Sequence, residues 1–174
     1  KGVGTGAAPV VAKIAHDMNI LTVGMVTLPF SHEGERKMNT AKDGVDLLRQ
    51  NMDALVVVNN DNIEKLPEFR RITVGETFST VDEVLRQSIG SIVEMIETTG
   101  FINVDFADAK TILTQGNTSE AILGTSVGRT ALEAVQNAIN SPLIELSIHG
   151  ARGVIVNITG SEDLTLDSVR EAND

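Results

Sequence analysis

The 174-residue sequence contains no cysteine, no tryptophan and no tyrosine, and five phenylalanines are its only large aromatic residues. The lack of cysteine excludes disulfide bonds, zinc–thiolate sites and thiol nucleophiles, and fits a reducing compartment. The shortage of aromatic rings removes the stacking platforms on which single-stranded nucleic acids bind. The core of this chain must therefore be built from aliphatic side chains.

Long apolar runs and positive charge are also scarce. No run approaches the roughly 18 residues that a membrane span needs, and the N-terminus lacks the basic and apolar blocks of a signal peptide. We therefore expect a cytoplasmic protein without membrane insertion. The 24 acidic side chains outnumber the 14 basic ones and give a formal charge of −10. This charge argues against a nucleic-acid partner.

The three histidines do not indicate a metal site. His16, His32 and His149 lie far apart in the sequence, and none has the spacing of a metal-binding motif. We therefore expect each to occupy a surface or core position, and we assign no residue of this chain as a metal ligand.

The apolar residues that are present follow an alternating order of strands and helices. Residues 21–27 and 53–58 are short β-branched runs, typical of buried parallel strands. Helical spacing of apolar residues follows Pro9 and recurs over residues 38–48. This order predicts an α/β fold with a parallel sheet. Ligands of such sheets bind at the carboxyl ends of the strands, where Glu33 and Asn60 fall.

The longest predicted helix covers residues 77–98, where apolar residues recur at three- and four-residue steps. Gly100 is the expected stop signal, and the segment Asn103–Asp108 directly behind it carries two carboxylates and a carboxamide. We therefore predict a long central helix that joins the two halves of the chain and ends in an acidic loop.

The second half is expected to have few strands for its helices. The patterns predict a polar turn at residues 59–62, helices at 108–113, 130–140 and 165–172, a weak strand at 120–123 and a further strand at 153–159. The sheet of this half is therefore expected to be incomplete.

The chain opens on a glycine-rich turn. Gly2, Gly4 and Gly6 surround Val3 and Thr5, and a helix is predicted to follow. Such a turn lets backbone N–H groups approach an anion at the positive end of the helix. A tight turn without a ligand explains the glycines equally well.

Together these motifs resemble the tubulin/FtsZ GTPase family of cytoskeletal proteins, whose bacterial members act in cell division. The resemblance is carried by residues 4–10, 60–61, 103–108 and 150–154, in the family's order and spacing. It covers essentially the whole chain. It also implies that about the first hundred residues of the family pattern and its last strands are absent, which would leave apolar faces exposed.

The resemblance implies a division of the chain into three parts. Residues 1–76 would be the C-terminal part of a GTP-binding domain, and residues 77–99 the central helix. Residues 100–174 would hold the acidic catalytic loop and the beginning of a smaller α/β activation domain.

The resemblance also implies a guanine nucleotide, GTP or GDP, with Mg²⁺. In the matching positions, the phosphate contacts are Gly2, Val3, Gly4, Thr5 and Gly6, the ribose and phosphate contacts Glu33 and Lys37, and the guanine contacts Asn60, Phe78 and Asp82. A carboxylate suits the last position, because it accepts hydrogen bonds from both N1–H and the exocyclic amine of guanine. From pattern alone, Phe78 is a core aromatic, Asp82 part of a solvated face and Asn60 a turn residue.

Catalysis is implied at the acidic loop. Asn103, Asp105 and Asp108 would reach the nucleotide of the next subunit in a head-to-tail filament and position the attacking water, so the principal partner is a second copy of the chain. Other cell-division proteins are expected to bind through segments absent here. Two aspartates at i and i+3 lie on one face of a helix. From pattern alone, the same carboxylates would merely cap the next helix.

Departures from the family pattern leave an alternative. Lys1 and Val3 stand where the family usually has glycine and threonine, and Lys37 stands where arginine is common, which loses a bidentate fork. An assembly module with weak or no hydrolysis is therefore the second hypothesis. A dinucleotide-dependent oxidoreductase is disfavoured, since the glycine spacing is not Gly-x-Gly-x-x-Gly.

Overall fold

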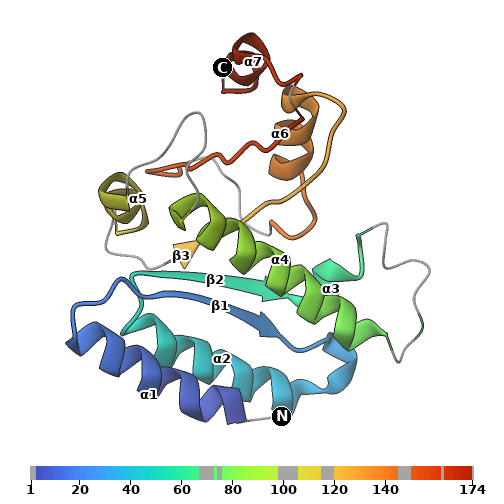
Figure 1. The fold of residues 1–174 in the computed structure, drawn as a ribbon. Coiled ribbons are helices and arrows are strands. Elements are labelled where there is room, and N and C mark those ends of the chain that lie inside the picture. The colour runs from blue at the N-terminus through green and yellow to red at the C-terminus, as the bar shows by residue number, and fades with distance from the viewer. Residues whose placement is uncertain are drawn as a thin grey trace.

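The computed structural model describes residues 3–66, 73, 76–97, 106–114, 120–144, 150–161 and 163–173 (Figure 1). In chain order, its elements are α1 (Val3–Asp17), β1 (Val23–Leu28), the 3-10 helix η1 (Ser31–Glu33), α2 (Glu35–Arg49), β2 (Ala54–Asn59), α3 (Asn60–Ile63), α4 (Thr77–Glu97), α5 (Phe106–Leu113), β3 (Glu120–Ala121), α6 (Ala131–Ile139) and α7 (Leu166–Asn173).

The strands form a parallel sheet in the order β1-β2-β3, which confirms the predicted fold class. β1 pairs with β2 over its whole length, from Val23 opposite Ala54 to Leu28 opposite Asn59. Helix α2 provides the crossover that a parallel connection requires. At the other side of β2, the short strand β3 is also held by an ion pair between Arg49 Nη2 and Glu120 Oε1 at 2.9 Å.

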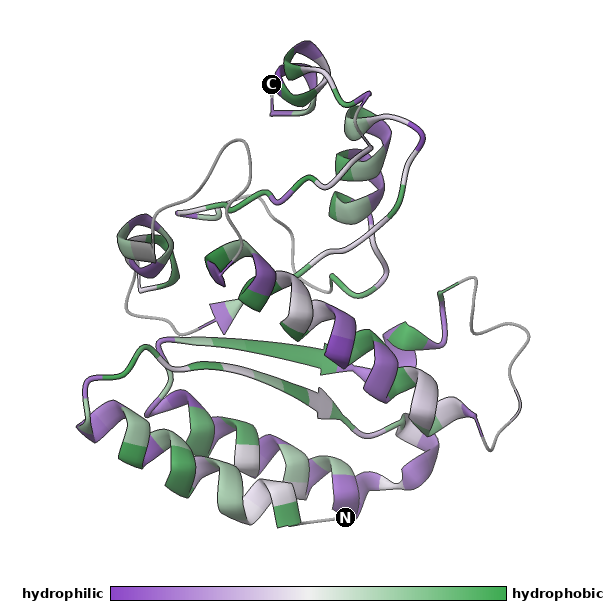
Figure 2. Ribbon diagram, viewed as in Figure 1, coloured by the Kyte–Doolittle hydropathy of each residue, from purple (hydrophilic) through white to green (hydrophobic). Residues whose placement is uncertain are grey.

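Alternate side chains of β2 pack against opposite layers of helices, because successive strand residues point to opposite faces. Leu55 packs under α1 and α2, in a cluster with Ala12, Val45 and Leu48. Val56 and Val58 face the other way, toward α3 and α4. Both paired strands are largely hydrophobic in Figure 2. The sheet is therefore the middle layer of a three-layer arrangement.

Helix α4 is the predicted central helix, and it is confirmed over Thr77–Glu97. Val81 of α4 is 4% exposed and belongs to the cluster that contains Val56, Val58 and the fully buried Ile63. Leu143, from the second half of the chain, joins the same cluster. The helix therefore lies between the sheet and the second half, as Figure 1 shows.

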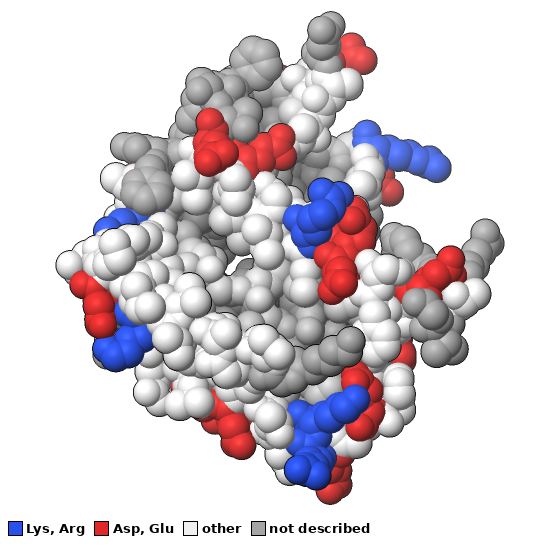
Figure 3. Space-filling model, turned by 60° about the horizontal axis from the view of Figure 1, so that its bottom comes forward, with Lys and Arg blue, Asp and Glu red and all other residues white. Residues whose placement is uncertain are grey.

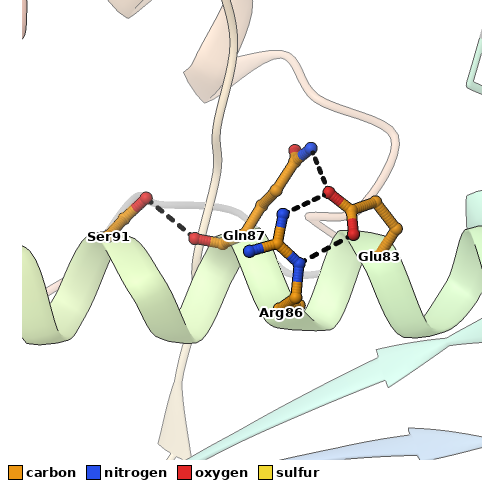
Figure 4. A network of polar contacts seen from close by, with 4 residues as sticks. All are labelled: Glu83, Arg86, Gln87 and Ser91. Atoms are coloured by element: carbon orange, nitrogen blue, oxygen red, sulfur yellow. Dashed lines mark hydrogen bonds and ion pairs between the residues drawn. The ribbon is translucent and has the colours of Figure 1, made fainter.

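The face of α4 turned away from the strands carries a polar network (Figure 4). Glu83 accepts hydrogen bonds from Arg86 Nε at 2.8 Å, from Arg86 Nη2 at 2.6 Å and from Gln87 Nε2 at 3.0 Å. The guanidinium of Arg86 lowers the pKa of Glu83 to about 2, with Gln87 contributing. The network is open to solvent, so its contribution to stability is small, but it keeps this face of the helix polar.

Helix α1 differs in that its outer face is apolar. Ala12 is its buried residue, whereas Val10, Val11 and Ile14, and Met18 just after the helix, are each more than half exposed. Figure 3, which turns this side of the molecule forward, shows few charged side chains over the middle of the view. The exposure of apolar faces expected from the sequence is thus found on α1.

Sequence-based expectations were wrong at residues 153–159 and 59–62. The predicted strand at residues 153–159 is absent, since none of residues 150–161 forms a strand. Val154 and Val156 are 68% and 43% exposed there, and strand pairing requires a neighbouring backbone. The predicted polar turn at residues 59–62 is instead the helix α3, because the Asn59 side chain accepts from Asp61 N at 3.1 Å and caps a helix there.

Close packing of α1 on α2 generates a test of the fold. A Cβ added at Gly44 would lie 2.5 Å from Thr5 Cγ2, whereas one added at Gly90 of α4 meets nothing within 4 Å. We expect Gly44→Ala to lower the free energy of unfolding by about 1–3 kcal/mol through overpacking. The control Gly90→Ala should raise it by about 0.5–1 kcal/mol.

Urea unfolding followed by circular dichroism measures both effects. Adding Thr5→Ser to Gly44→Ala removes the clashing methyl group and should restore most of the loss. A Gly44→Ala variant that is as stabilised as Gly90→Ala would show that α1 does not pack on α2 in this way.

Candidate functional site

The carboxyl ends of β1 and β2 lie side by side at one end of the sheet, which we call the carboxyl edge. Most of the predicted site residues lie around it. Leu28 and Asn59, the last residues of the two strands, are register partners. The beginning of α1, the 3-10 helix η1, α3 and the beginning of α4 lie around this edge (Figure 1). The edge is therefore the position at which parallel sheets bind ligands.

The glycine motif lies at this edge in a form that corrects the sequence prediction. Gly4, Thr5 and Gly6 are not in a turn that precedes the helix, because α1 already begins at Val3. The first N–H groups of a helix have no intrahelical acceptor, and they lie at its positive end. The space beside Gly4 and Gly6 is open. An anion can therefore approach the backbone here; Gly2 lies outside the described residues.

Glu33 and Lys37 meet beside the end of β1. The Glu33 carboxylate accepts from Lys37 Nζ at 3.0 Å and from Phe30 N at 3.1 Å. The hydrogen bond from Lys37, and then that from the Phe30 backbone, lower the pKa of Glu33. Gly34 turns the chain into α2 with a φ of 100°, a conformation that favours glycine. An ionised acceptor and a cation are thus held together at the start of α2.

Asn60 carries the feature of this edge that most clearly indicates a ligand. It begins α3 directly after β2, and it is 4% exposed. Its Oδ1 atom is buried and has no hydrogen-bond partner. A buried acceptor without a partner costs about 1–3 kcal/mol, and most such groups in proteins are satisfied. The site is thus ready to accept one hydrogen bond from a bound molecule.

Aromatic rings form one side of the edge. Phe78, in the first turn of α4, is 56% exposed and meets the buried Phe30 edge-to-face at 6.0 Å. His32 stacks on the same Phe30 ring at 5.1 Å. Asp82 lies one turn after Phe78 on α4 and is also exposed. A planar ligand can contact Phe78 while its polar edge faces Asp82.

Sequence reasoning missed several residues of this edge. Phe30 was not assigned to the site, and His32 was expected at an ordinary surface or core position, although both follow β1 and lie close to Glu33 in the sequence. Asp61 was treated as part of a turn, although its carboxylate accepts from Ser31 N at 2.9 Å. The one available signal was a row of polar residues directly after a buried strand, which does not tell which side chain faces which loop.

The predicted catalytic group lies elsewhere. Asp108 is exposed in the first turn of α5, whereas Asn103 and Asp105 lie outside the described residues. Lys110, also on α5, lines a small cavity together with Leu21 and Asp53, which precede β1 and β2. The strands span about 20 Å, at roughly 3.3 Å per residue. Asp108 and Asn60 therefore lie toward opposite ends of the sheet.

Within the described ranges, no group of three or more His, Asp or Glu side chains is placed to hold a metal ion. In the same part of the chain, no helix combines the length and the apolar character needed to cross a membrane.

Comparison with known proteins identifies the family of both parts of the chain. Residues 1–68 match the tubulin/FtsZ family, GTPase domain, and residues 116–174 match the FtsZ family, C-terminal domain. An empty FtsZ dimer from M. jannaschii is 41% identical with a TM-score of 0.87, and the alignment covers 98% of this chain and 50% of that one. A point mutant of the same FtsZ is also 41% identical with a TM-score of 0.87, and the alignment covers 97% of this chain and 51% of that one.

A more distant structure shares the fold. CetZ1 from Haloferax volcanii, solved as a GDP-bound monomer, is 21% identical with a TM-score of 0.61, and the alignment covers 78% of this chain and 40% of that one. The chain spans about half the length of the FtsZ structures that it matches. On the two domain matches and the 41% identity to FtsZ, the chain belongs to the tubulin/FtsZ family.

Proposed function

We propose that this chain is part of a GTP-binding and GTP-hydrolysing cytoskeletal protein that polymerises with itself and acts in cell division. The observation that carries the proposal is the buried, unpartnered Oδ1 atom of Asn60 at the carboxyl edge of the sheet. The proposed location is the cytoplasm at the division site. We do not restrict the source to bacteria, since the two similar FtsZ structures come from M. jannaschii.

The nucleotide would lie along this edge. Guanine offers an N–H donor to Asn60, while its ring contacts the exposed face of Phe78 and its N1–H and amine face Asp82. Glu33 suits the ribose hydroxyl groups, because it is kept ionised by its hydrogen-bond donors. The phosphates would be bound by the first N–H groups of α1, and Lys37 would supply a cation.

Hydrolysis would take place between subunits. Because Asp108 and Asn60 lie toward opposite ends of the sheet, one subunit does not bring its own α5 to its own nucleotide edge, by which we mean the edge at the carboxyl ends of β1 and β2 where the nucleotide would lie. A head-to-tail contact, which is heterologous and generates filaments, brings the α5 end of one copy to the nucleotide edge of the next. In this arrangement Asn103, Asp105 and Asp108 position the attacking water, and the reaction needs little more than positioning.

Mg²⁺ fits the proposal as an ion held chiefly by the phosphate oxygens. Mg²⁺ retains several water molecules and needs one or two protein ligands in nucleotide sites, so a cluster of three acidic side chains is not required. Bound there, it would neutralise charge on the phosphates. No residue of this chain is assigned as its ligand.

The alternative is an assembly module of the same family with weak or no hydrolysis. It is favoured by the ammonium of Lys37, which Glu33 engages at 3.0 Å, and by Val3, which offers no hydroxyl at the beginning of α1 and is 80% exposed. Both features reduce the side-chain donors available to phosphate. Turnover by assembled filaments distinguishes this alternative from the GTPase.

The guanine contact predicts opposite behaviour for two neighbouring asparagines. Asn60→Leu keeps the size of the side chain but removes the acceptor, so the affinity for a fluorescent GDP analogue should fall about tenfold. Loss of the oxygen should by itself cost no stability without nucleotide, because this atom has no partner. These measurements require a chain of the relatives' full length that carries this sequence.

Asn62→Leu is the matched control. Asn62 is also buried, at 5% exposure, but it accepts from Lys65 Nζ at 2.5 Å. This variant should lose stability and keep its nucleotide affinity. Equal affinities of the parent and Asn60→Leu would remove the main support for the site.

Hydrolysis between subunits predicts complementation. Asp108→Ala filaments should assemble but turn over GTP about a hundredfold more slowly. When Asp108→Ala subunits are mixed in equal amounts with Asn60→Leu subunits, about a quarter of the head-to-tail contacts should combine an intact Asn60 with a neighbour's intact Asp108, and these contacts should hydrolyse GTP. The GTP concentration is kept below the dissociation constant of the Asn60→Leu subunits. Phosphate release and light scattering measure turnover and assembly.

Two results would refute this part of the proposal. Co-assembly without any recovery would indicate hydrolysis within one subunit. Unchanged turnover of the Asp108→Ala variant would support the assembly module instead.

A further inference from the structure

We infer that Asp61 is a positioning residue for the nucleotide edge. Its carboxylate ties the loop after β1 to the helix after β2, and so fixes the separation between Glu33 and Asn60. The inference rests on the proposed function, and it adds a residue that contacts no ligand itself.

The link is made by both oxygens of one carboxylate. Asp61 Oδ1 accepts from Ser31 N at 2.9 Å, and Oδ2 accepts from the Ser31 hydroxyl group. The two residues are thirty positions apart in the sequence. These two hydrogen bonds, the hydroxyl first, lower the pKa of Asp61. The carboxylate is therefore ionised at neutral pH and engages one residue at two points, which fixes direction as well as distance.

Each end of the link is adjacent to a residue of the proposed site. Asp61 follows Asn60 directly, and both belong to the first turn of α3. Ser31 begins η1, in which Glu33 is the third residue, and the Glu33 carboxylate closes this turn onto Phe30 N. A shift of Ser31 would therefore move Glu33 relative to Asn60. A ligand that contacts both residues depends on that spacing, because small misplacements weaken binding.

A capping role does not explain this carboxylate. Asn59 already caps α3, through its side-chain oxygen and Asp61 N. The carboxylate oxygens of Asp61 point instead to the other loop, where Ser31 uses both. Neither partner is buried, so the link contributes little to global stability, as is usual for exposed charged contacts. Its expected effect is on the geometry of the edge.

The experiment uses a chain of the relatives' full length that carries this sequence, with a fluorescent GDP analogue as the probe. Asp61→Ala should raise the dissociation constant about tenfold, the effect of losing hydrogen bonds to a charged group. KM for GTP should rise by a similar factor, and kcat should stay within about twofold, since Asp61 does not touch the reacting atoms.

Two further variants separate positioning from general destabilisation. Asp61→Asn can accept from Ser31 N and donate to the Ser31 hydroxyl, and it should keep the dissociation constant within about threefold of the parent. Asp17→Ala removes another exposed carboxylate, which accepts from Lys13 Nζ at 2.8 Å toward the end of α1. It should leave both the affinity and kcat unchanged.

The results distinguish this inference from the proposed function. If the parent protein binds no guanine nucleotide, the proposed function fails. If the parent binds and Asp61→Ala binds equally well, or if Asp61→Ala lowers kcat and leaves KM unchanged, the positioning role of Asp61 is wrong.

Discussion

The structure depends on the parallel pairing of β1 with β2. This pairing, in register from Val23 opposite Ala54 to Leu28 opposite Asn59, brings two segments separated by a whole helix to one edge. Parallel strands require a crossover, and α2 is that crossover, so the same constraint that builds the sheet also places Glu33 and Lys37 at its edge. The positions of the polar residues at this edge therefore follow from the backbone arrangement.

The same pairing also keeps Asn60 and helix α5 far apart within one subunit. Strands of six residues separate the carboxyl edge, at which we propose that the nucleotide binds, from the end of the sheet at which α5 lies. Helix α4 packs against one face of the same sheet. Because the sheet and α4 are closely packed, they cannot deform enough to bring α5 to the carboxyl edge of the same subunit. In the account proposed here, polymerisation supplies the missing proximity, because a neighbour presents its α5 end to the nucleotide edge.

Sequence patterns predicted the parallel sheet, the central helix and helix α6, because the spacing of apolar residues is a local signal; the predicted start of α6 at Thr130 is its N-cap in the structure. The strand expected at residues 153–159 failed because a strand also needs a partner, which spacing within one segment does not reveal. The helical start of α1 was missed because glycines favour turns when read alone. The link between Ser31 and Asp61 was not predictable, since it joins two loops whose proximity arises only from the register of the sheet.

We propose that the carboxyl edge of the sheet binds a guanine nucleotide whose base donates a hydrogen bond to Asn60 Oδ1. The most direct test is a crystal structure with GDP of a chain of the relatives' full length that carries this sequence. We expect a guanine N–H within hydrogen-bonding distance of Asn60 Oδ1 and phosphates at the beginning of α1. GDP bound elsewhere, with Asn60 Oδ1 still unpaired, would contradict this proposal.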